Sequence, residues 1–214
     1  MENKSEYSRI MDILPQEIEK KSFEIITEEL GDIVLDKEKE SIIKRVIHTT
    51  ADFEYVKNLK FSDNAVETAM EAIRNGASIV TDTQMAKAGI NKKKLAKFGG
   101  EVFNFMSDED VAQIAKENGT TRAKACMDKA AELDKDLIFA IGNAPTALIR
   151  LYELIKDGKL NPKLIIGVPV GFVNVVSSKE LIMEAGVPFI VAQGRKGGSN
   201  VAAAICNALI YMTE

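Results

Sequence analysis

Short apolar segments rich in β-branched residues alternate along most of the chain with segments of helical periodicity. The apolar segments predict five strands, at 77–82, 101–106, 136–142, 163–169 and 188–194. Helical spacing of apolar residues marks the segments around them, which are 63–75, 107–117, 121–134, 145–156, 177–185 and 199–212. Continuous apolar strands joined by helices are typical of a parallel sheet covered on both faces. We therefore expect an α/β fold of three layers, α/β/α, around a mainly parallel sheet of about five strands.

Two helical segments precede the first predicted strand. Residues 15–30 place Ser22 on an apolar helix face, where a polar hydroxyl group is unusual and calls for an explanation. A second helix is expected over 37–47, and the spacing of Arg45 and His48 puts them on a shared side of it.

The segment F-E-Y-V-K at 53–57 is a further strand candidate. No internal repeat, low-complexity tract or linker rich in proline and glycine interrupts the chain. We therefore expect a single domain, residues 1–214, with an N-terminal helical extension.

The composition is that of an acidic protein without a global basic field. Of the 214 residues, 46% are hydrophobic and 28% are charged, and the formal net charge is −4. Nucleic acid and an anionic membrane surface are therefore not expected as main partners. No run of about 20 apolar residues predicts a transmembrane helix, and the polar N-terminal residues do not predict a secretory signal.

The two cysteines, Cys126 and Cys206, lie far apart within helical segments. Scattered cysteines are typical of a reducing compartment, so we expect a cytoplasmic protein. With two cysteines and one histidine, the chain lacks the usual ligands of a zinc or iron–sulfur centre. We therefore expect no such metal site.

Small and polar residues gather where the predicted strands end, the edge at which open α/β sheets bind their ligands. Four segments lie there, T-D-T-Q-M (81–85), G-N-A-P-T (142–146), P-V-G-F-V-N (169–174) and G-R-K-G-G-S-N (194–200). Flexible polar residues at several strand ends indicate a broad pocket rather than a narrow slot.

The segment G-R-K-G-G-S-N opens the last predicted helix directly after a strand. Its glycines can turn backbone N–H groups toward a ligand, while the helix N-terminus, Arg195 and Lys196 add positive charge. The segment matches neither the P-loop pattern nor the dinucleotide pattern. It is either an anion-binding loop or a glycine-rich turn that Ser199 caps.

Other candidates also have an ordinary structural interpretation. In G-N-A-P-T, Asn143 or Ala144 can begin a helix with Pro145 in its first turn, so the segment is either a helix start or a binding loop. Gly171 in P-V-G-F-V-N is explained by a turn. Arg122 stands in the first turn of a helix, where the dipole disfavours a cation, and is either a surface arginine or a contact for a ligand carboxylate.

His48, in R-V-I-H-T-T-A-D-F, is the only histidine of the chain. Its ordinary pKa lies near neutrality, which suits a general acid or base. A histidine at a helix C-terminus can also donate hydrogen bonds to the last carbonyl groups of the helix, which lack a helical partner. No G-x-S-x-G motif and no reactive-looking cysteine accompanies it, so if His48 acts chemically, it moves protons.

Five segments are specific when taken together: R-V-I-H-T-T-A-D-F, T-D-T-Q-M, A-I-G-N-A-P-T-A-L, G-V-P-V-G-F-V-N and G-R-K-G-G-S-N-V-A-A-A-I-C-N-A-L-I. In this order, over nearly the whole chain, they resemble the precorrin-8X (cobalt-precorrin-8) methylmutase family of corrin biosynthesis. The resemblance implies a flavodoxin-like fold and a homodimer that binds its tetrapyrrole near the subunit interface. It implies an isomerase of cobalamin biosynthesis that moves a methyl group from carbon 11 to carbon 12 of ring C. It also implies no cofactor, with any cobalt carried by the substrate.

The resemblance assigns roles to individual residues as well. The family's essential histidine matches His48, its substrate-contacting serine and arginine match Ser22 and Arg45, and a further arginine matches Arg122. With the strand-end segments, the substrate-binding candidates are Ser22, Arg45, Thr81, Asp82, Met85, Arg122, Gly142, Asn143, Ala144, Thr146, Gly171, Arg195, Lys196, Gly197, Gly198 and Ser199. The sequence H-T-T-A-D-F lacks the Cys-Gly that often follows the histidine in members acting on the metal-free ring, which favours the cobalt branch.

Two other functions stay open at the level of the sequence. A non-catalytic tetrapyrrole carrier would use the same loops, and His48 would be dispensable, so a turnover assay separates it from a methylmutase. A flavodoxin-like nucleotide binder would use G-R-K-G-G-S and would bind FMN or a nucleotide saturably. The missing nucleotide fingerprints argue against this second alternative.

Overall fold

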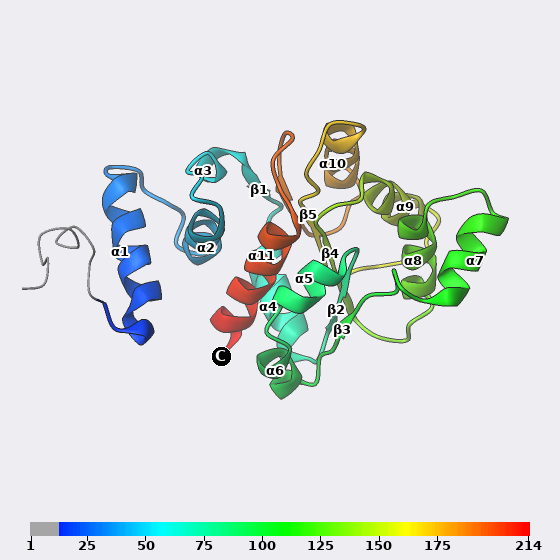
Figure 1. Cartoon of the computed structure of the whole chain (residues 1–214), viewed down its shortest axis with the longest axis horizontal. Helices are drawn as coiled ribbons and strands as arrows, with labels where there is room; N and C mark the ends of the chain where they lie inside the picture. The colour runs from blue at the N-terminus through cyan, green and yellow to red at the C-terminus, as the bar shows by residue number, and fades with distance from the viewer. Residues whose placement is uncertain (1–12) are drawn as a thin grey trace, which may run out of the picture. The chain divides into compact units, whose positions relative to one another are not determined.

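The computed structural model describes residues 13–214 and contains a six-stranded sheet (Figure 1). Its strands are β1 (Leu59–Phe61), β2 (Ser78–Thr81), β3 (Val102–Phe103), β4 (Leu137–Ile141), β5 (Leu164–Gly167) and β6 (Phe189–Ala192). They lie in the order β1-β6-β5-β4-β2-β3. Strands β2 to β6 pair in parallel, and β1 pairs with β6 in the antiparallel direction, with Leu59 opposite Ala192.

The order of the parallel strands indicates where a ligand would bind. Numbered by themselves, the strands β2 to β6 follow the flavodoxin-like order 2-1-3-4-5. In this order the chain reverses direction across the sheet between β2 and β4, and ligands bind in the crevice outside the carboxyl ends of these two strands. The predicted flavodoxin-like fold with a mainly parallel sheet is confirmed.

The antiparallel strand β1 differs from the prediction. The candidate strand at 53–57 is wrong, because Tyr55–Asn58 form the one-turn helix α3 with the Tyr55 side chain buried. The strand begins directly afterwards, at Leu59, where L-K-F alternates at the edge of the sheet. Of the strand expected at 101–106, only the two residues of β3 pair with a neighbour, at the opposite edge.

Helices cover both faces of the sheet (Figure 1). Besides α3, this arrangement is built from α2 (Glu40–Thr50), α4 (Ala65–Arg74), α5 (Gln84–Gly89), α6 (Lys92–Leu95), α7 (Glu109–Glu117), α8 (Arg122–Ala131), α9 (Pro145–Lys156), α10 (Val175–Met183) and α11 (Ser199–Thr213). Helices α4, α5 and α11 pack on one face, and α2 packs on α11. Helix α9 lies on the other face between α8 and α10, and α7 packs on α8. The three-layer arrangement is as predicted, whereas α5 and α6 were not expected from the pattern.

Contacts within the chain group it into two compact units, Met1–Val34 and Leu35–Glu214. The described part of the first unit is a short 3-10 turn, Pro15–Glu17, followed by helix α1 (Ile18–Leu30). The whole sheet belongs to the second unit. The helical nature of residues 15–30 is confirmed, and the single domain over residues 1–214 stays a prediction.

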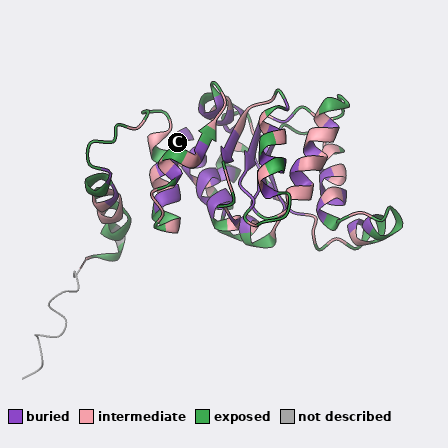
Figure 2. Cartoon of the chain, turned by 90° about the horizontal axis from the view of Figure 1, so that it is seen from above, coloured by how far each residue is buried: buried purple, intermediate pink, exposed green. Residues whose placement is uncertain are grey.

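The buried residues concentrate in the strands and on the helix faces turned toward them (Figure 2). Phe139 and Ile165 of the sheet pack with Leu148 of α9, and Cys126 of α8 belongs to the same core. Cys206 of α11 is buried as well, and both cysteines are free thiols. Burial raises the pKa of Cys126 to about 11 and that of Cys206 to about 12. None of the described helices combines the length and the apolar character that crossing a bilayer requires.

Candidate active site

Asp82, directly after β2, joins the ends of the two strands that flank the crevice. Its carboxylate accepts hydrogen bonds from the backbone N–H groups of Gly142 (2.8 Å), Asn143 (2.8 Å) and Ala144 (2.6 Å), which follow β4 and lead into α9. A carboxylate at a helix start is favourable, because it satisfies N–H groups that lack a helical partner and meets the positive end of the dipole. These N–H groups of G-N-A-P-T therefore have a partner within the protein.

The polar end of β2 is buried and fully bonded. Asp82 is 2% exposed, and burial raises its pKa while the three N–H donors oppose that rise. The Thr81 hydroxyl donates to the Phe103 carbonyl (3.2 Å), and the Asn104 side-chain amide donates to the Thr81 carbonyl (2.7 Å). These bonds fix the backbone from which the Asp82 side chain projects.

The start of α11 packs against the same crevice. A Cβ atom on Gly142 would lie 2.7 Å from the Ser199 Cα atom, so only glycine permits this approach. The Ser199 and Thr83 hydroxyl oxygens are 2.8 Å apart, and Thr83 also accepts a hydrogen bond from the Ala86 N–H at the start of α5. Ser199 thus pairs with Thr83, and it does not cap α11, which begins after Gly198 without a side-chain cap. The N-terminal ends of α5, α9 and α11 meet at the ends of β2 and β4.

The glycine loop, defined here as residues 194–199, connects β6 with α11. Gly197 approaches the end of β5 so closely that a Cβ atom would lie 2.1 Å from the Val168 carbonyl oxygen. The Gly198 N–H donates to the same oxygen at 2.8 Å. The loop is therefore seated on the residues that follow β5, and this close packing requires glycine at position 197.

The two cations of the glycine loop have different surroundings. Lys196 forms ion pairs with Asp52 (2.6 Å) and Glu54 (2.8 Å), and hydrogen bonds to these acids hold its pKa above the ordinary value. The Arg195 guanidinium lies over the Phe172 ring, 5.4 Å from its centroid, which is a cation–π contact. Lys196 thus binds acids of its own chain, whereas Arg195 is exposed beside an aromatic ring.

His48 lies in the last turn of α2, and its side chain is exposed. The helix ends at Ala51, which adopts a left-handed conformation (φ 52°), and Asp52 follows directly. Because Asp52 and Glu54 bind Lys196, the chain just after His48 is tied to the glycine loop.

Arg45 reaches from α2 to the far end of α11. Its guanidinium lies 4.7 Å from the centroid of the Tyr211 ring, and the Lys94 ammonium lies 4.5 Å from the same centroid. Lys94 also forms an ion pair with Glu214. The Tyr211 hydroxyl accepts a hydrogen bond from the Asn91 side-chain amide at 3.3 Å. The ring is thus held in place and supports Arg45 from one side.

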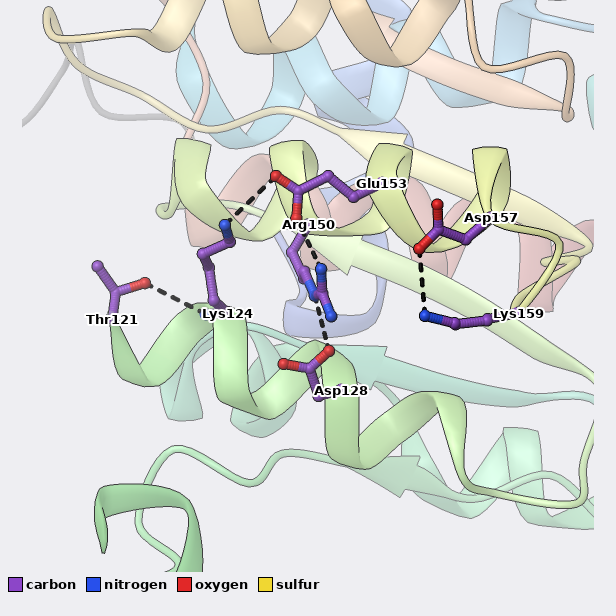
Figure 3. A network of polar contacts seen from close by, with 7 residues as sticks. All are labelled: Thr121, Lys124, Asp128, Arg150, Glu153, Asp157 and Lys159. Atoms are coloured by element: carbon purple, nitrogen blue, oxygen red, sulfur yellow. Dashed lines mark hydrogen bonds and ion pairs between the residues drawn. The ribbon is translucent and has the colours of Figure 1, made fainter. Parts of the chain in front are cut away.

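Arg122 is exposed at the first position of α8. The preceding Thr121 caps this helix by accepting from the Lys124 N–H (3.2 Å), and its hydroxyl donates to the Thr146 hydroxyl at the start of α9 (3.0 Å). Figure 3 shows the polar contacts that hold α8 and α9 side by side, in which Arg150 binds one carboxylate of each helix at 2.7 Å. Arg122 and Thr146 therefore lie at adjoining helix starts.

Large apolar side chains are exposed near these polar groups. Met85 in the first turn of α5 is 71% exposed, and Phe172 after β5 is 80% exposed. Both follow the carboxyl end of a parallel strand, which places them at the ligand edge of the sheet. The Gly171 N–H donates to the Arg195 carbonyl at 3.2 Å and so fixes the segment of Phe172 against the glycine loop. Exposed apolar surface among polar groups is typical of a binding surface.

The structure brings most of the predicted residues of the second unit to one edge of the sheet. Thr81, Asp82 and 142–144 meet Ser199 in the crevice, and the glycine loop lies beside them. Ser22 belongs to the first unit, where its hydroxyl donates to the Ile18 carbonyl one turn earlier (2.9 Å). That any of these residues contacts a substrate stays a prediction.

Sequence reasoning missed three residues that shape this edge. Thr83 could have been recognised as a threonine directly before a helix, the usual position of an N-cap. Lys179 falls four residues after Val175 and three before Ile182, and a lysine on such an apolar face is a signal in itself. Asn104 gave no signal in its local sequence. Among the described residues, no three His, Cys, Asp or Glu side chains lie close enough together to hold a metal ion.

Comparison with known proteins gives a consistent result over nearly the whole chain. A family model described as precorrin-8X methylmutase matches residues 17–212. The cobalt-precorrin-8 methylmutase of Priestia megaterium is 48% identical over 202 residues, which are 94% of this chain and 90% of the relative. That of Salmonella typhimurium is 48% identical over 203 residues, 92% of this chain and 95% of the relative.

The fold agrees with a solved structure of the same name. The crystal structure of precorrin-8X methylmutase from Thermus thermophilus superposes with a TM-score of 0.83 at 41% identity, covering 92% of this chain and 97% of that one. The match therefore extends from the sequence to the arrangement of the sheet and its helices. The chain belongs to the precorrin-8X methylmutase family.

Proposed function

We propose that this protein is an isomerase of cobalamin biosynthesis that moves a methyl group from carbon 11 to carbon 12 of ring C in cobalt-precorrin-8, with His48 as the group that donates and accepts the proton. The observation that carries the proposal is the link between α2 and the glycine loop. Lys196 binds Asp52 and Glu54 just after His48, so the proposed proton donor and the proposed anion-binding loop are held by one ion-pair cluster.

The methyl shift requires only two things from the protein, a proton donor and a site that holds the ring in a fixed conformation. The bond from the methyl group to carbon 11 breaks as the bond to carbon 12 forms, so no protein nucleophile is needed. A proton placed on the conjugated ring by His48 promotes the shift, and its return to His48 restores the enzyme. General acid–base help of this kind contributes about 10²–10⁴-fold, and holding the ring in a reactive conformation can contribute more.

The ligand edge suits a large ring with several carboxylate side chains. Two exposed arginines, Arg122 and Arg195, can bind carboxylates, which guanidinium groups hold in a bidentate manner. Arg45 is proposed to bind another carboxylate, from the family resemblance alone. The exposed Met85 and Phe172 suit the apolar face of the ring. Ser22 is proposed as a further contact, from the family resemblance.

The cobalt-containing ring is the better candidate for the substrate. Relatives named cobalt-precorrin-8 methylmutase range from 36% to 48% identity. The two at 48% exceed the proteins named precorrin-8X methylmutase from Pseudomonas aeruginosa and Sinorhizobium, at 36%, and from Thermus thermophilus, at 41%. The sequence H-T-T-A-D-F after the histidine points the same way. Incubation with the metal-free ring and with its cobalt complex, compared by kcat/KM, tests this choice.

The remaining features of the proposal follow from the family and from the chain itself. We propose that the protein works as a homodimer, with the tetrapyrrole near the subunit interface, and that it needs no added cofactor. Full turnover in the presence of a chelator, with only the substrate added, tests the second point. The two free thiols support a reducing, cytoplasmic location.

The decisive experiment follows the corrin chromophore by absorption after mixing enzyme with cobalt-precorrin-8. His48→Ala is expected to keep its fold and its tetrapyrrole binding, because the side chain is exposed, while kcat falls by about 10²–10⁴-fold. Arg74→Ala is the matched control, since it removes an exposed basic side chain from the last turn of another helix, α4.

Two outcomes would contradict parts of the proposal. A His48→Ala protein that converts substrate at the wild-type rate ends the catalytic role of His48. A wild-type protein that binds the tetrapyrrole but never converts it supports the non-catalytic carrier instead.

A further inference from the structure

Lys179, in α10, is a buried lysine that the proposed reaction does not use. Its side chain is 1% exposed, on the face of α10 that also carries the buried Val175 and Ile182. Its Nζ atom donates hydrogen bonds to the carbonyl oxygens of Gly194 and Lys196, each at 2.8 Å. Both carbonyls belong to the glycine loop, so one buried ammonium group binds the loop at two points.

The burial of a charged ammonium group at this position is energetically unfavourable. Of the residues that the structure describes, none places a carboxylate within ion-pair distance of Lys179, and burial lowers its pKa to about 8. A buried ammonium group without an acid partner is unfavourable unless its hydrogen bonds compensate for the lost water. The two loop carbonyls are therefore the groups that keep this lysine charged near neutral pH.

The elements packed around Lys179 provide no other compensation. Strand β6 has no ionisable residue, and neither has the segment 169–174 after β5. The loop itself carries only cations, and the acids of α10 are exposed on its surface. Besides Lys179, the ionisable groups on these elements are Arg195 and Lys196 of the loop, Glu180 of α10 and Glu184 directly after it. The adjoining α9 adds Arg150, Tyr152, Glu153 and Lys156, of which Arg150 and Glu153 pair with each other.

The geometry of the peptide bond shows what the two hydrogen bonds do to the loop. In a trans peptide the carbonyl group and the following N–H group point in opposite directions, and the described residues contain no cis peptide. Because both carbonyls bound by the ammonium turn toward α10, the N–H groups of Arg195 and Gly197 turn away from it. Backbone N–H groups presented together by a glycine-rich turn form an anion-binding site.

We propose that Lys179 is a positioning residue, which holds the glycine loop so that the N–H groups of Arg195 and Gly197 receive a carboxylate of the tetrapyrrole. This inference rests on the proposed function, since it concerns the same site and the same substrate. Lys179 itself does not touch the substrate, because its ammonium group is buried beneath the loop.

The first test compares the KM and kcat of three variants with cobalt-precorrin-8. Lys179→Met removes both hydrogen bonds but keeps a long unbranched side chain. We expect its KM to rise about 10–100-fold, the effect of losing hydrogen bonds from a charged group, with a smaller change in kcat. Lys179→Arg keeps the charge and the donors, and is expected to restore most of the affinity. An unchanged KM in Lys179→Met would overturn the proposal.

The matched control is Lys156→Met. Lys156 in α9 also donates to two backbone carbonyls, those of Glu184 (3.1 Å) and Ala185 (3.4 Å), but these lie at the C-terminal end of α10 and not in the glycine loop. Its KM is expected to equal that of the wild type. A similar rise in both methionine variants would show a general effect on α10 and would contradict the positioning role.

The second test is the pH profile. The wild-type KM is expected to rise as the pH passes about 8, because the neutral amine donates weaker hydrogen bonds to the loop. In Lys179→Arg this rise should be absent, since a guanidinium group keeps its proton over the whole range. A rise that persists in Lys179→Arg arises from another group and contradicts the proposal.

The third test needs no substrate, so it stands if the proposed function fails. Amide hydrogen exchange at Gly198, whose N–H is bonded to Val168, reports how firmly the loop is seated. Exchange is expected to be faster in Lys179→Met and unchanged in Lys156→Met. If Lys179→Met does not fold, the wild-type protection factor on either side of pH about 8 replaces it, and an unchanged factor would overturn the proposal.

Discussion

A single carboxylate, that of Asp82, fixes the ends of β2 and β4 relative to each other. It accepts three backbone N–H groups at the start of α9 and is almost completely buried. An asparagine of the same shape would place an NH₂ group where one of these oxygens now accepts. The N–H groups on that side would then be buried without an acceptor, which is the costly way to lose a hydrogen bond.

Asp82→Asn is therefore expected to lower the free energy of unfolding by about 1–3 kcal/mol. Urea unfolding followed by circular dichroism measures this difference. Asp63→Asn, at an exposed aspartate near the start of α4, is the control and should unfold at the wild-type midpoint. Equal midpoints for all three proteins would show that the Asp82 network does not contribute to stability.

At the scale of elements, α2 is joined by packing to α11 and by charge to the glycine loop before it. Helix α2 packs along α11, and the acids just beyond its end bind Lys196. The hydrogen bond from Lys196 holds the pKa of Asp52 below its usual value. A carboxyl group whose folded pKa is lowered stabilises the fold above the pKa of the unfolded chain, about 3.9, and loses that effect as the pH falls through its folded pKa.

Asp52→Asn is expected to unfold at lower urea concentration than the wild type near neutral pH and at the same concentration in strong acid, where Asp52 is protonated in both states. The same variant should raise the KM, because the glycine loop loses one of its two acid partners. Urea titrations at several pH values measure the first effect. A midpoint difference that does not depend on pH would contradict the ion-pair explanation.

The elements themselves were largely predictable, and the bonds between them were not. Pro145 and the apolar spacing after it are sufficient to predict α9, and the glycines before Ser199 predict the start of α11. The 53–57 segment has the composition of a strand, but the alternating residues that pair with β6 come later. The contact between Thr83 and Ser199 joins residues 116 positions apart, and local sequence patterns contain no information on such a pair.

At the scale of the whole molecule, an acidic chain exposes a cation and several apolar side chains at the carboxyl edge of its sheet. The net charge is −4, yet Arg195 is exposed at the carboxyl edge of the sheet beside exposed apolar side chains. A homodimer would cover part of such a surface, and the second subunit would provide a further contact surface for the large ring. This expectation comes from the family resemblance.

Sedimentation equilibrium is therefore expected to give a mass of about 47 kDa, twice the 23.5 kDa of one chain. The measurement should be made at the enzyme concentrations used for turnover, because a dimer of modest affinity dissociates on dilution. A mass of 23.5 kDa at concentrations that support full activity would show that the monomer is the working form.

The two buried thiols make this chain convenient for site-specific labelling. Maleimide reagents react with the thiolate, and burial keeps both native cysteines protonated at neutral pH. A cysteine introduced in place of Val173, which is 79% exposed in the segment after β5, would therefore react selectively. A fluorophore at that single position would report the arrival of the tetrapyrrole in real time, without prior removal of either native cysteine.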